Sequence, residues 1–189
     1  MSSDKNKRLI TKELLILADK NDQIVGYDTK EKCHQGEGLL HRAFSIFIFN
    51  DHKQVLMQKR STEKLLWPFY WSNSVCSHPR KGERYEEAAI RRLNEELGFE
   101  TSLQFLFKFQ YQAQFKNIGS ENEICSVYIG KANGTVQANP SEIAEWKYSD
   151  IRELTEDVQA HPHRYTPWFK MEWEEIQTRF CPQIENLYV

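Results

Sequence analysis

The sequence predicts an α/β protein in which a mixed sheet is flanked by helices. Residues 103–115 alternate between apolar and polar side chains, which is the period of a strand with one buried face. Residues 84–97 carry apolar side chains three and four positions apart, which is the period of an amphipathic helix. Shorter apolar runs bounded by turn residues predict further strands before and after that helix.

Length and charge limit the class of protein. The chain has 189 residues, which fits a single domain over residues 1–189 with a core large enough to enclose a pocket. A formal net charge of -2 gives no electrostatic reason to expect a nucleic-acid partner. The polar start, residues 1–10, lacks an apolar signal core and is expected to be mobile. The most apolar run, residues 43–49, is too short to cross a bilayer, so we expect no membrane insertion.

The cysteine pattern predicts free thiols. The four cysteines, Cys33, Cys76, Cys125 and Cys181, show neither CxxC spacing nor the density of a secreted disulfide scaffold. We therefore expect a reducing, cytoplasmic location. Cys76 lies in the run WSNSVCSHPRKGE, two positions before His78, and could be buried filler, a metal ligand or a reacting group.

The first third of the chain predicts two pairs of strands. Residues 13–19 and 24–29 form the first pair, joined by the turn KNDQ. Residues 43–49 and 54–60 form the second, across NDHK, a gap of hairpin length. The polar stretch between the two pairs contains two histidines.

The long strand over 103–115 is followed by another at 121–129. Its alternation is expected to place one apolar set on a single face: Leu103, Phe105, Phe107, Phe109, Tyr111, Ala113 and Phe115.

Three helices are expected. The helix over 84–97 stops at Gly98, and a second runs from Asp150 to about Val158. A third begins at Thr166 and Pro167, a capping residue followed by proline. Its apolar stripe consists of Phe169, Trp173, Ile176 and Phe180. We expect Trp146 and Trp173 in the core, whereas Trp168, at the helix start and off its stripe, is a candidate pocket residue.

The helix over 84–97 also carries a charged motif. Taken alone, its Arg and Glu residues indicate a solvated face, with each pair worth a few tenths of a kcal/mol. Their order resembles the Nudix box, through Glu83, Arg91, Leu93, Glu95, Glu96, Gly98 and Phe99. The sequence departs from that pattern at Ser77, where the box has Gly, and at Arg92, where it has Glu. The metal-binding glutamates are therefore incomplete, which favours a Nudix-like fold over a standard Nudix pyrophosphohydrolase.

Four separated motifs resemble a narrower family, type I isopentenyl-diphosphate isomerase. They are WPFYWSNSVCSHP, RRLNEELG, ENEIC and TPWF, in that order, within a resemblance that runs from about Lys30 to Trp168. The resemblance implies interconversion of isopentenyl and dimethylallyl diphosphate through a tertiary carbocation, by a monomer or homodimer. The partner is then a small isoprenoid diphosphate.

The resemblance also implies a divalent metal, Mg, Mn or Zn, in a site of three histidines and two carboxylates. The implied ligands are His34, His41, His78, Glu121 and Glu123. Residues 121 and 123 are two apart on a predicted strand, so their carboxylates share one face. Glu96 is implied for a second Mg that arrives with the substrate diphosphate. We expect His52, His161 and His163 to bind no metal.

The remaining roles follow from the resemblance and from the chemistry of the alkene. Cys76 and Glu123 are the expected acid and base, and which of them delivers the first proton stays open. Tyr111 is expected to assist proton transfer, and the indole of Trp168 to stabilise the cation. The implied diphosphate-binding residues are Lys30, Arg60, Lys64, Ser77 and Arg92.

Two other readings remain. A Nudix hydrolase of nucleoside diphosphate derivatives would tolerate loss of Cys76, and a non-catalytic Nudix-like module would bind a ligand without turnover. A zinc-structured interaction domain lacks the closed, cysteine-rich ligand set that it needs.

Overall fold

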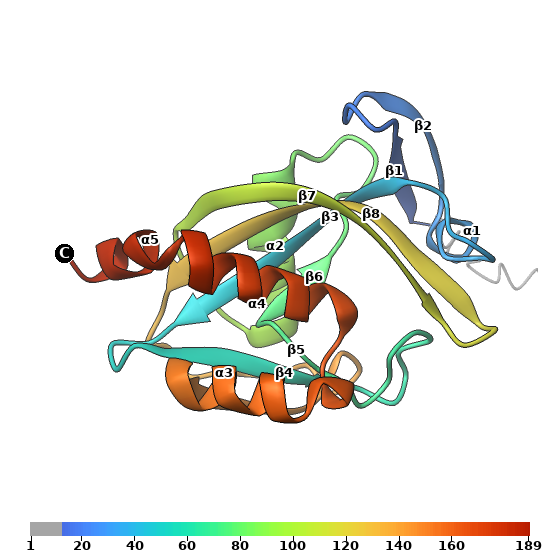
Figure 1. The fold of residues 1–189 in the computed structure, drawn as a ribbon. Coiled ribbons are helices and arrows are strands. Elements are labelled where there is room, and N and C mark those ends of the chain that lie inside the picture. The colour runs from blue at the N-terminus through green and yellow to red at the C-terminus, as the bar shows by residue number, and fades with distance from the viewer. Residues whose placement is uncertain (1–12) are drawn as a thin grey trace, which may run out of the picture.

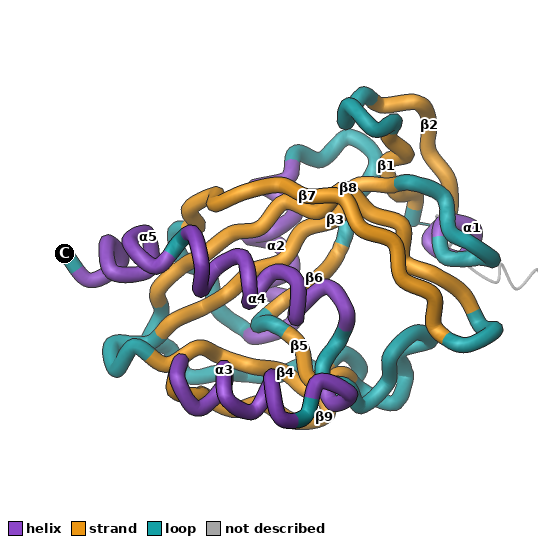
Figure 2. The backbone as a smooth tube through the Cα atoms, in the orientation of Figure 1, coloured by secondary structure: helices purple, strands orange, loops and turns teal. Residues whose placement is uncertain are grey.

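A computed structural model describes residues 13–189, so the mobility expected for residues 1–10 lies outside the described residues. Over the described residues, the chain forms one nine-stranded mixed sheet with helices on both faces (Figures 1 and 2). The strands are β1 (Leu14–Ala18), β2 (Ile24–Thr29), β3 (His41–Phe49), β4 (Gln54–Arg60), β5 (Trp71–Ser72), β6 (Val75–Ser77), β7 (Leu103–Phe115), β8 (Gly119–Lys131) and β9 (Ile143–Asp150). The helices are α1 (Lys30–Cys33), α2 (Tyr85–Leu97), α3 (Ile151–Ala160), α4 (Pro167–Arg179) and α5 (Cys181–Glu185), with short 3-10 turns at Pro162–Arg164 and Asn186–Tyr188. None of the helices within this range could span a bilayer.

Strand β3 is the centre of the sheet. It runs parallel to β8 from the pair His41–Glu123 to the pair Phe49–Lys131, and β8 pairs antiparallel with β7. On its other edge β3 pairs antiparallel with β6, where Ser45 faces Cys76. Cys76 on β6 and Glu123 on β8, which are far apart in the sequence, therefore lie on the two strands that flank β3.

The second predicted pair of strands, β3 and β4, is hydrogen-bonded as a hairpin only next to the turn that joins them. Strands β3 and β4 share the single pair Phe49–Val55, after which β4 pairs with β9 and β5 instead. The sheet thus divides into two parts that diverge away from the turn. The pocket described below takes residues from both parts.

Helices α4 and α2 cover opposite faces of the sheet (Figure 1). The alternation of β3 supplies both cores: Phe47 packs beside Phe169 and Trp173 of α4, whereas Phe44 packs on the side of Leu93 of α2. The rings of Phe169 and Trp173 stack with centroids 6.0 Å apart. The predicted stripe is therefore confirmed as the buried face of α4 for Phe169, Trp173 and Ile176, whereas Phe180 follows the helix and is partly buried.

Strand β7 has its predicted bounds but not a single apolar face. A bulge between Phe105 and Phe107 inserts Leu106, which shifts the register against β8. Phe105 is consequently 50% exposed, on the opposite side from Phe107 to Phe115. The placement of Leu103 and Phe105 with the other apolar residues of this strand was wrong.

The expected helix ends are largely confirmed. Gly98, with φ of 77°, ends α2, and Asp150 caps α3 by accepting a 2.8 Å hydrogen bond from the backbone N–H of Arg152. Pro167 begins α4, but the Thr166 side chain makes no capping bond. The assignment of Trp146 to the core was wrong, because it lies on β9 and is 40% exposed.

Candidate active site and metal centre

The five residues implied as metal ligands form one cluster. His34 follows α1, His41 begins β3 and His78 follows β6, while Glu121 and Glu123 lie two apart on β8. All five are buried, and one ligand atom from each lies within 4.8 Å of every other. The imidazole centroids are 4.9 to 5.2 Å apart. The described residues thus provide a preformed set of three nitrogen and two carboxylate ligands.

Backbone carbonyls orient two of the histidines. Nδ1 of His34 lies 2.6 Å from the carbonyl oxygen of Lys30, and Nδ1 of His41 lies 2.7 Å from that of Leu39. Because a carbonyl oxygen only accepts, each Nδ1 carries the proton and each Nε2 presents its lone pair to the cluster. This is the arrangement that a metal ligand requires.

Two orphaned atoms indicate that the cluster fits a cation. Nε2 of His41 and Oε2 of Glu121 are buried and accept no hydrogen bond among the described residues, and each faces another ligand atom of the cluster: Oε2 of Glu121 lies 2.8 Å from Nε2 of His34, and Nε2 of His41 lies 3.5 Å from Oε1 of Glu123. Burial of such polar atoms is unfavourable unless another group satisfies them. The donor set suits Mg, Mn or Zn, and a bound divalent cation would be the missing partner of both atoms.

Glu123 is the most constrained member of the cluster. Its Oε1 lies 2.7 Å from Nε2 of His78, and its Oε2 accepts a 2.6 Å hydrogen bond from the hydroxyl of Tyr111. Burial raises the pKa of Glu123, but His41 and Tyr111 outweigh it, so the pKa lies below its usual value. Burial and the Glu123 charge hold the pKa of Tyr111 well above its ordinary value, so Tyr111 stays protonated as a donor.

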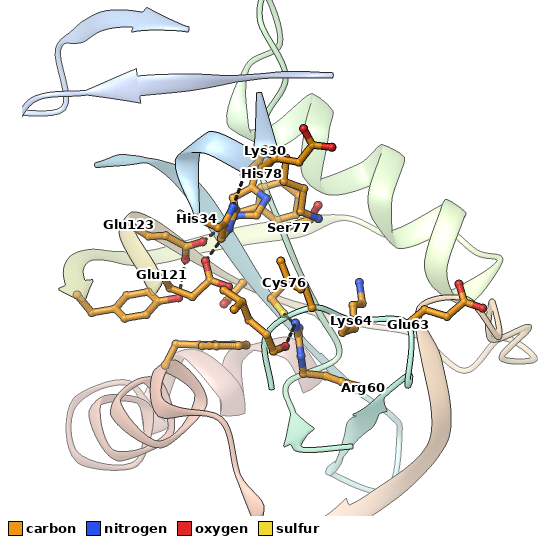
Figure 3. Close-up of a pocket in the computed structure, with 17 residues that line it drawn as sticks. Lys30, His34, Arg60, Glu63, Lys64, Cys76, Ser77, His78, Glu121 and Glu123 are labelled. Carbon is orange, nitrogen blue, oxygen red and sulfur yellow. Dashed lines mark hydrogen bonds and ion pairs between the residues drawn. The ribbon is translucent and has the colours of Figure 1, made fainter. Parts of the chain in front are cut away.

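A cavity of about 340 Å³ opens beside this cluster, within the size range of small-molecule sites. Figure 3 shows His34, His78, Glu121 and Glu123 of the cluster at one side of the cavity and Cys76, Arg60 and Lys64 at the other. Predicted residues that line it are Lys30, His34, Arg60, Lys64, Cys76, Ser77, His78, Tyr111, Glu121, Glu123 and Trp168.

Cys76 is a protonated thiol on the cavity wall. It is partly buried, and the cysteines over residues 13–189 are all free. Burial raises its pKa to about 11, although the Arg60 guanidinium, with Nη1 3.5 Å from the sulfur, opposes the shift. A thiol of this kind holds its proton at neutral pH.

Arg60 contacts the Cys76 thiol, the Trp168 ring and the loop that contains Leu66 and Trp67. Its Nε and Nη2 donate to the carbonyl oxygens of Trp67 and Leu66, at 3.1 and 2.9 Å. Its guanidinium carbon lies 5.2 Å from the ring centroid of Trp168. Trp67 and Phe69 have φ of 47° and 64°, a conformation that bulky residues rarely adopt, and the Arg60 bonds help to hold it.

Comparison with known proteins identifies the family of this chain. Residues 39–169 match the model of the NUDIX domain. The chain is 42% identical over 166 residues to isopentenyl-diphosphate Delta-isomerase 1 of Photorhabdus laumondii, a match that covers 87% of this chain and 94% of that relative. It is 43% identical to the isopentenyl-diphosphate Delta-isomerase of Serratia proteamaculans, over 83% of this chain and 87% of the relative. The chain belongs to the isopentenyl-diphosphate Delta-isomerase family.

Solved structures show the same fold at greater distance. A Deinococcus radiodurans protein matches with a TM-score of 0.71 and 22% identity, over 86% of this chain and 98% of that one. A MutT protein of Methanosarcina mazei matches with a TM-score of 0.62 and 14% identity, over 73% and 93%. The predicted Nudix-like fold is confirmed.

Two of the residues predicted from this family lie behind the cavity. Arg92 and Glu96 of α2 form a 2.6 Å ion pair, and Glu96 is 1% exposed. Arg92 also contacts Glu142 at 2.9 Å, and Lys64 pairs with the same carboxylate. Burial raises the pKa of Glu142, but Lys64 and Arg92 bring it down to about 2. In this structure Arg92 and Lys64 are thus held by carboxylates.

Sequence reasoning missed several residues in or next to the cavity, of which Ser45, Leu66 and Glu142 matter most. Ser45 and Leu66 line the cavity, and Glu142 holds two of its expected cations. Ser45 had a signal, because it is the one polar residue in the apolar run AFSIFIF. Glu142 had none, since it belongs to no motif and approaches α2 only through the fold.

Proposed function

We propose that the protein interconverts isopentenyl diphosphate and dimethylallyl diphosphate, in the isoprenoid pathway of the cytoplasm. One observation carries the proposal: Cys76, a thiol that burial keeps protonated, lines the same cavity as Glu123 of the histidine and glutamate cluster. The names of the relatives support the same reaction. Free cysteines fit a reducing compartment.

The chemistry needs one acid and one base at different carbons. An unactivated alkene is a very weak base, so a positioned acid protonates it and leaves a tertiary carbocation, and a base then removes a proton from the neighbouring carbon. We assign these roles to Cys76 and Glu123, with Tyr111 assisting through its hydrogen bond to Glu123. One proton enters and one leaves, so the product is an isomer.

A divalent metal held by the cluster would fix the Glu123 carboxylate and set its acidity. The carbonyl bonds to His34 and His41 keep both rings oriented for this role. We assign Trp168 to the cation, because an indole face attracts positive charge and its buried ring excludes water that would trap the cation.

We assign the diphosphate to the basic side of the cavity. Lys30, Arg60 and Lys64 line it, beside Ser77, and cations of this kind suit a diphosphate. Arg92 and the Mg that we assign to Glu96 join them only if the Arg92–Glu96 pair opens, since that pair is closed at 2.6 Å.

The test is to incubate the protein with isopentenyl diphosphate and Mg in heavy water and to follow the product by proton NMR. We expect dimethylallyl diphosphate that carries deuterium, and no such product from Cys76→Ala. Release of phosphate from a nucleoside diphosphate derivative, unaffected by Cys76→Ala, would establish a Nudix hydrolase instead. Metal content is measured on the same samples, so that inactive protein is not mistaken for metal-free protein.

A further inference from the structure

Glu172 is a fully buried carboxyl group behind the cavity. It lies on α4, one helical turn after Trp168, and is 0% exposed. The thiol of Cys125 donates to its Oε1 at 3.5 Å, and the hydroxyl of Ser45 also faces the carboxyl. Its Oε2 has no hydrogen-bond partner among the described residues. Carboxyl groups are rarely buried in this way, and none of the proposed steps uses Glu172.

No basic side chain pairs with Glu172 among residues 13–189. Cys125 on β8 contacts it, and the charge of Glu123 on the same strand adds to the rise in its pKa. Burial raises its pKa to about 8, against the opposing hydrogen bonds from Ser45 and Cys125. The carboxyl is therefore predominantly protonated at pH 7.

A short polar connection joins Glu172 to the reacting thiol. Ser45 lines the cavity and is the cross-strand partner of Cys76, so the two side chains lie on the same side of the sheet. The Cys125 sulfur lies 3.6 Å from the Ser45 hydroxyl oxygen. Glu172, Cys125 and Ser45 thus form a polar triangle that ends at the cavity wall beside Cys76.

We propose that Glu172 is a positioning residue: through its polar contacts with Cys125 and Ser45 it fixes the Ser45 hydroxyl beside Cys76 and holds the Trp168 turn of α4 against the sheet. The inference rests on the proposed isomerase function, in which Cys76 and Trp168 contact the reacting carbons. The protonated carboxyl can donate as well as accept, so every member of the triangle can be paired. Ionisation removes that donor and leaves a buried anion without a cation, so the triangle must open or admit water.

The first test compares isomerisation rates at pH 7 and pH 9. At pH 9 only about a tenth of a group with a pKa of about 8 stays protonated, so we expect the wild type to lose about tenfold more rate than Glu172→Gln does. Glu172→Gln keeps the hydrogen bonds and should have a rate at pH 7 close to wild type. Glu172→Met lacks those bonds and should be slower at both pH values, without the extra alkaline loss. The inference is overturned if Glu172→Gln follows the wild-type profile, or if Glu172→Met matches the wild-type rate at pH 7.

A second test is independent of turnover. Amide hydrogen exchange in α4 should be equal in wild type and Glu172→Gln at pH 7, and faster in the wild type at pH 9. Glu174→Gln, on the exposed side of the same helix, is the matched control and should behave as wild type. Thermal stability gives a further test, because the raised pKa of Glu172 fixes the direction of the stability difference between Glu172→Gln and the wild type. The advantage of Glu172→Gln over wild type should be absent below about pH 4.5, grow as the pH rises to about 8, and then level off.

The two tests separate the inference from the function on which it rests. A wild type without isomerisation, but with the expected exchange difference, overturns the proposed function and supports the positioning of α4 by Glu172. Equal exchange in wild type and Glu172→Gln at pH 9 overturns the positioning whatever the turnover is. If Glu172→Gln does not fold, Glu172→Met takes its place: exchange in its α4 should be faster than in the wild type at pH 7 and should not show the further increase that the wild type shows between pH 7 and pH 9 relative to Glu174→Gln.

Discussion

Tyr111 and Glu123 face each other directly across β7 and β8, with the Tyr111 hydroxyl 2.6 Å from Oε2 of the carboxylate. On the other side of β8, Glu123 is the parallel partner of His41. The carboxylate thus lies between an aromatic donor and a metal-facing histidine, on three adjacent strands. Its position is set by the sheet register rather than by a flexible loop, which favours precise proton transfer.

Tyr111→Phe should slow isomerisation by roughly 10²-fold, because the carboxylate loses the donor that holds it. The hydrogen bond lowers the pKa of Glu123, so its removal should move the acid limb of the rate profile to higher pH. The measurement is the rate of deuterium incorporation between pH 5 and pH 8. Tyr188→Phe, which loses a 2.8 Å bond to the Asn50 carbonyl away from the cavity, is the control. An unchanged profile in Tyr111→Phe would remove this residue from the proton pathway.

Cys76→Ser should lower the rate by roughly 10³-fold or more while metal content stays unchanged, because a hydroxyl is a much weaker acid than a thiol. Cys181→Ser is the matched control, since that cysteine is exposed and outside the cavity. Alkylation by iodoacetamide provides an independent check. Burial raises the pKa of Cys76 to about 11, so it should react more slowly than Cys181 at pH 8 by mass spectrometry. Faster labelling of Cys76 would contradict the buried, protonated thiol.

Much of the site follows from the sequence because motifs fix residue identity. The family resemblance implied all five members of the cluster, His34, His41, His78, Glu121 and Glu123, which the structure brings together. Short-range periodicity and turn chemistry predicted the bounds of β7 and the stop at Gly98.

Pairing between distant strands is not encoded in that way. The sequence does not say that β3 lies parallel to β8, or that β4 leaves β3 after one pair, because both depend on the whole sheet. The bulge in β7 did have a signal, since Leu106 breaks the alternation between Phe105 and Phe107. The buried Glu172 had none, because its place on α4 is that of an ordinary charged helix residue until the packing is known.

Gly119→Ala should weaken metal binding without touching a ligand. A Cβ at Gly119 would lie 2.4 Å from the carbonyl oxygen of His34, a contact that backbone cannot tolerate without moving. The same carbonyl accepts a 3.0 Å bond from the Ser120 N–H, so His34 must shift with it. We expect roughly 10- to 100-fold lower metal affinity, as for other disturbances around metal ligands, measured by titration and elemental analysis. Gly134→Ala is the control, because its nearest contact would be 3.9 Å, and equal metal content in both variants would refute the steric argument.

Arg92→Leu should destabilise the fold by roughly 3 to 5 kcal/mol, because it leaves the buried Glu96 without its cation. Burial raises the pKa of Glu96 and Arg92 opposes this, so the pKa rises further in the variant. A carboxyl with a raised pKa can be neutral at low pH, so the loss should be smaller at pH 5 than at pH 8 in urea unfolding. Arg152→Leu breaks an exposed pair with Glu156 and should change stability little. Equal and small losses of unfolding free energy in both variants would show that the Arg92–Glu96 pair does not stabilise the fold.

Two substitutions of Trp168 distinguish stabilisation of the carbocation from packing alone. Its ring is 3% exposed, with Arg60 5.2 Å from its centroid, and it lines the cavity. Trp168→Phe keeps an aromatic face and should lose a few-fold in rate, in line with a cation–π interaction of about 0.5 to 2 kcal/mol. Trp168→Ala loses that face and admits water, so it should be slower still and release some hydrated alcohol, visible by NMR. Trp173→Phe, at the core residue directly after Glu172, should lower stability but leave the product clean. Equal losses in Trp168→Phe and Trp168→Ala, without the alcohol, would mean that the indole only fills space.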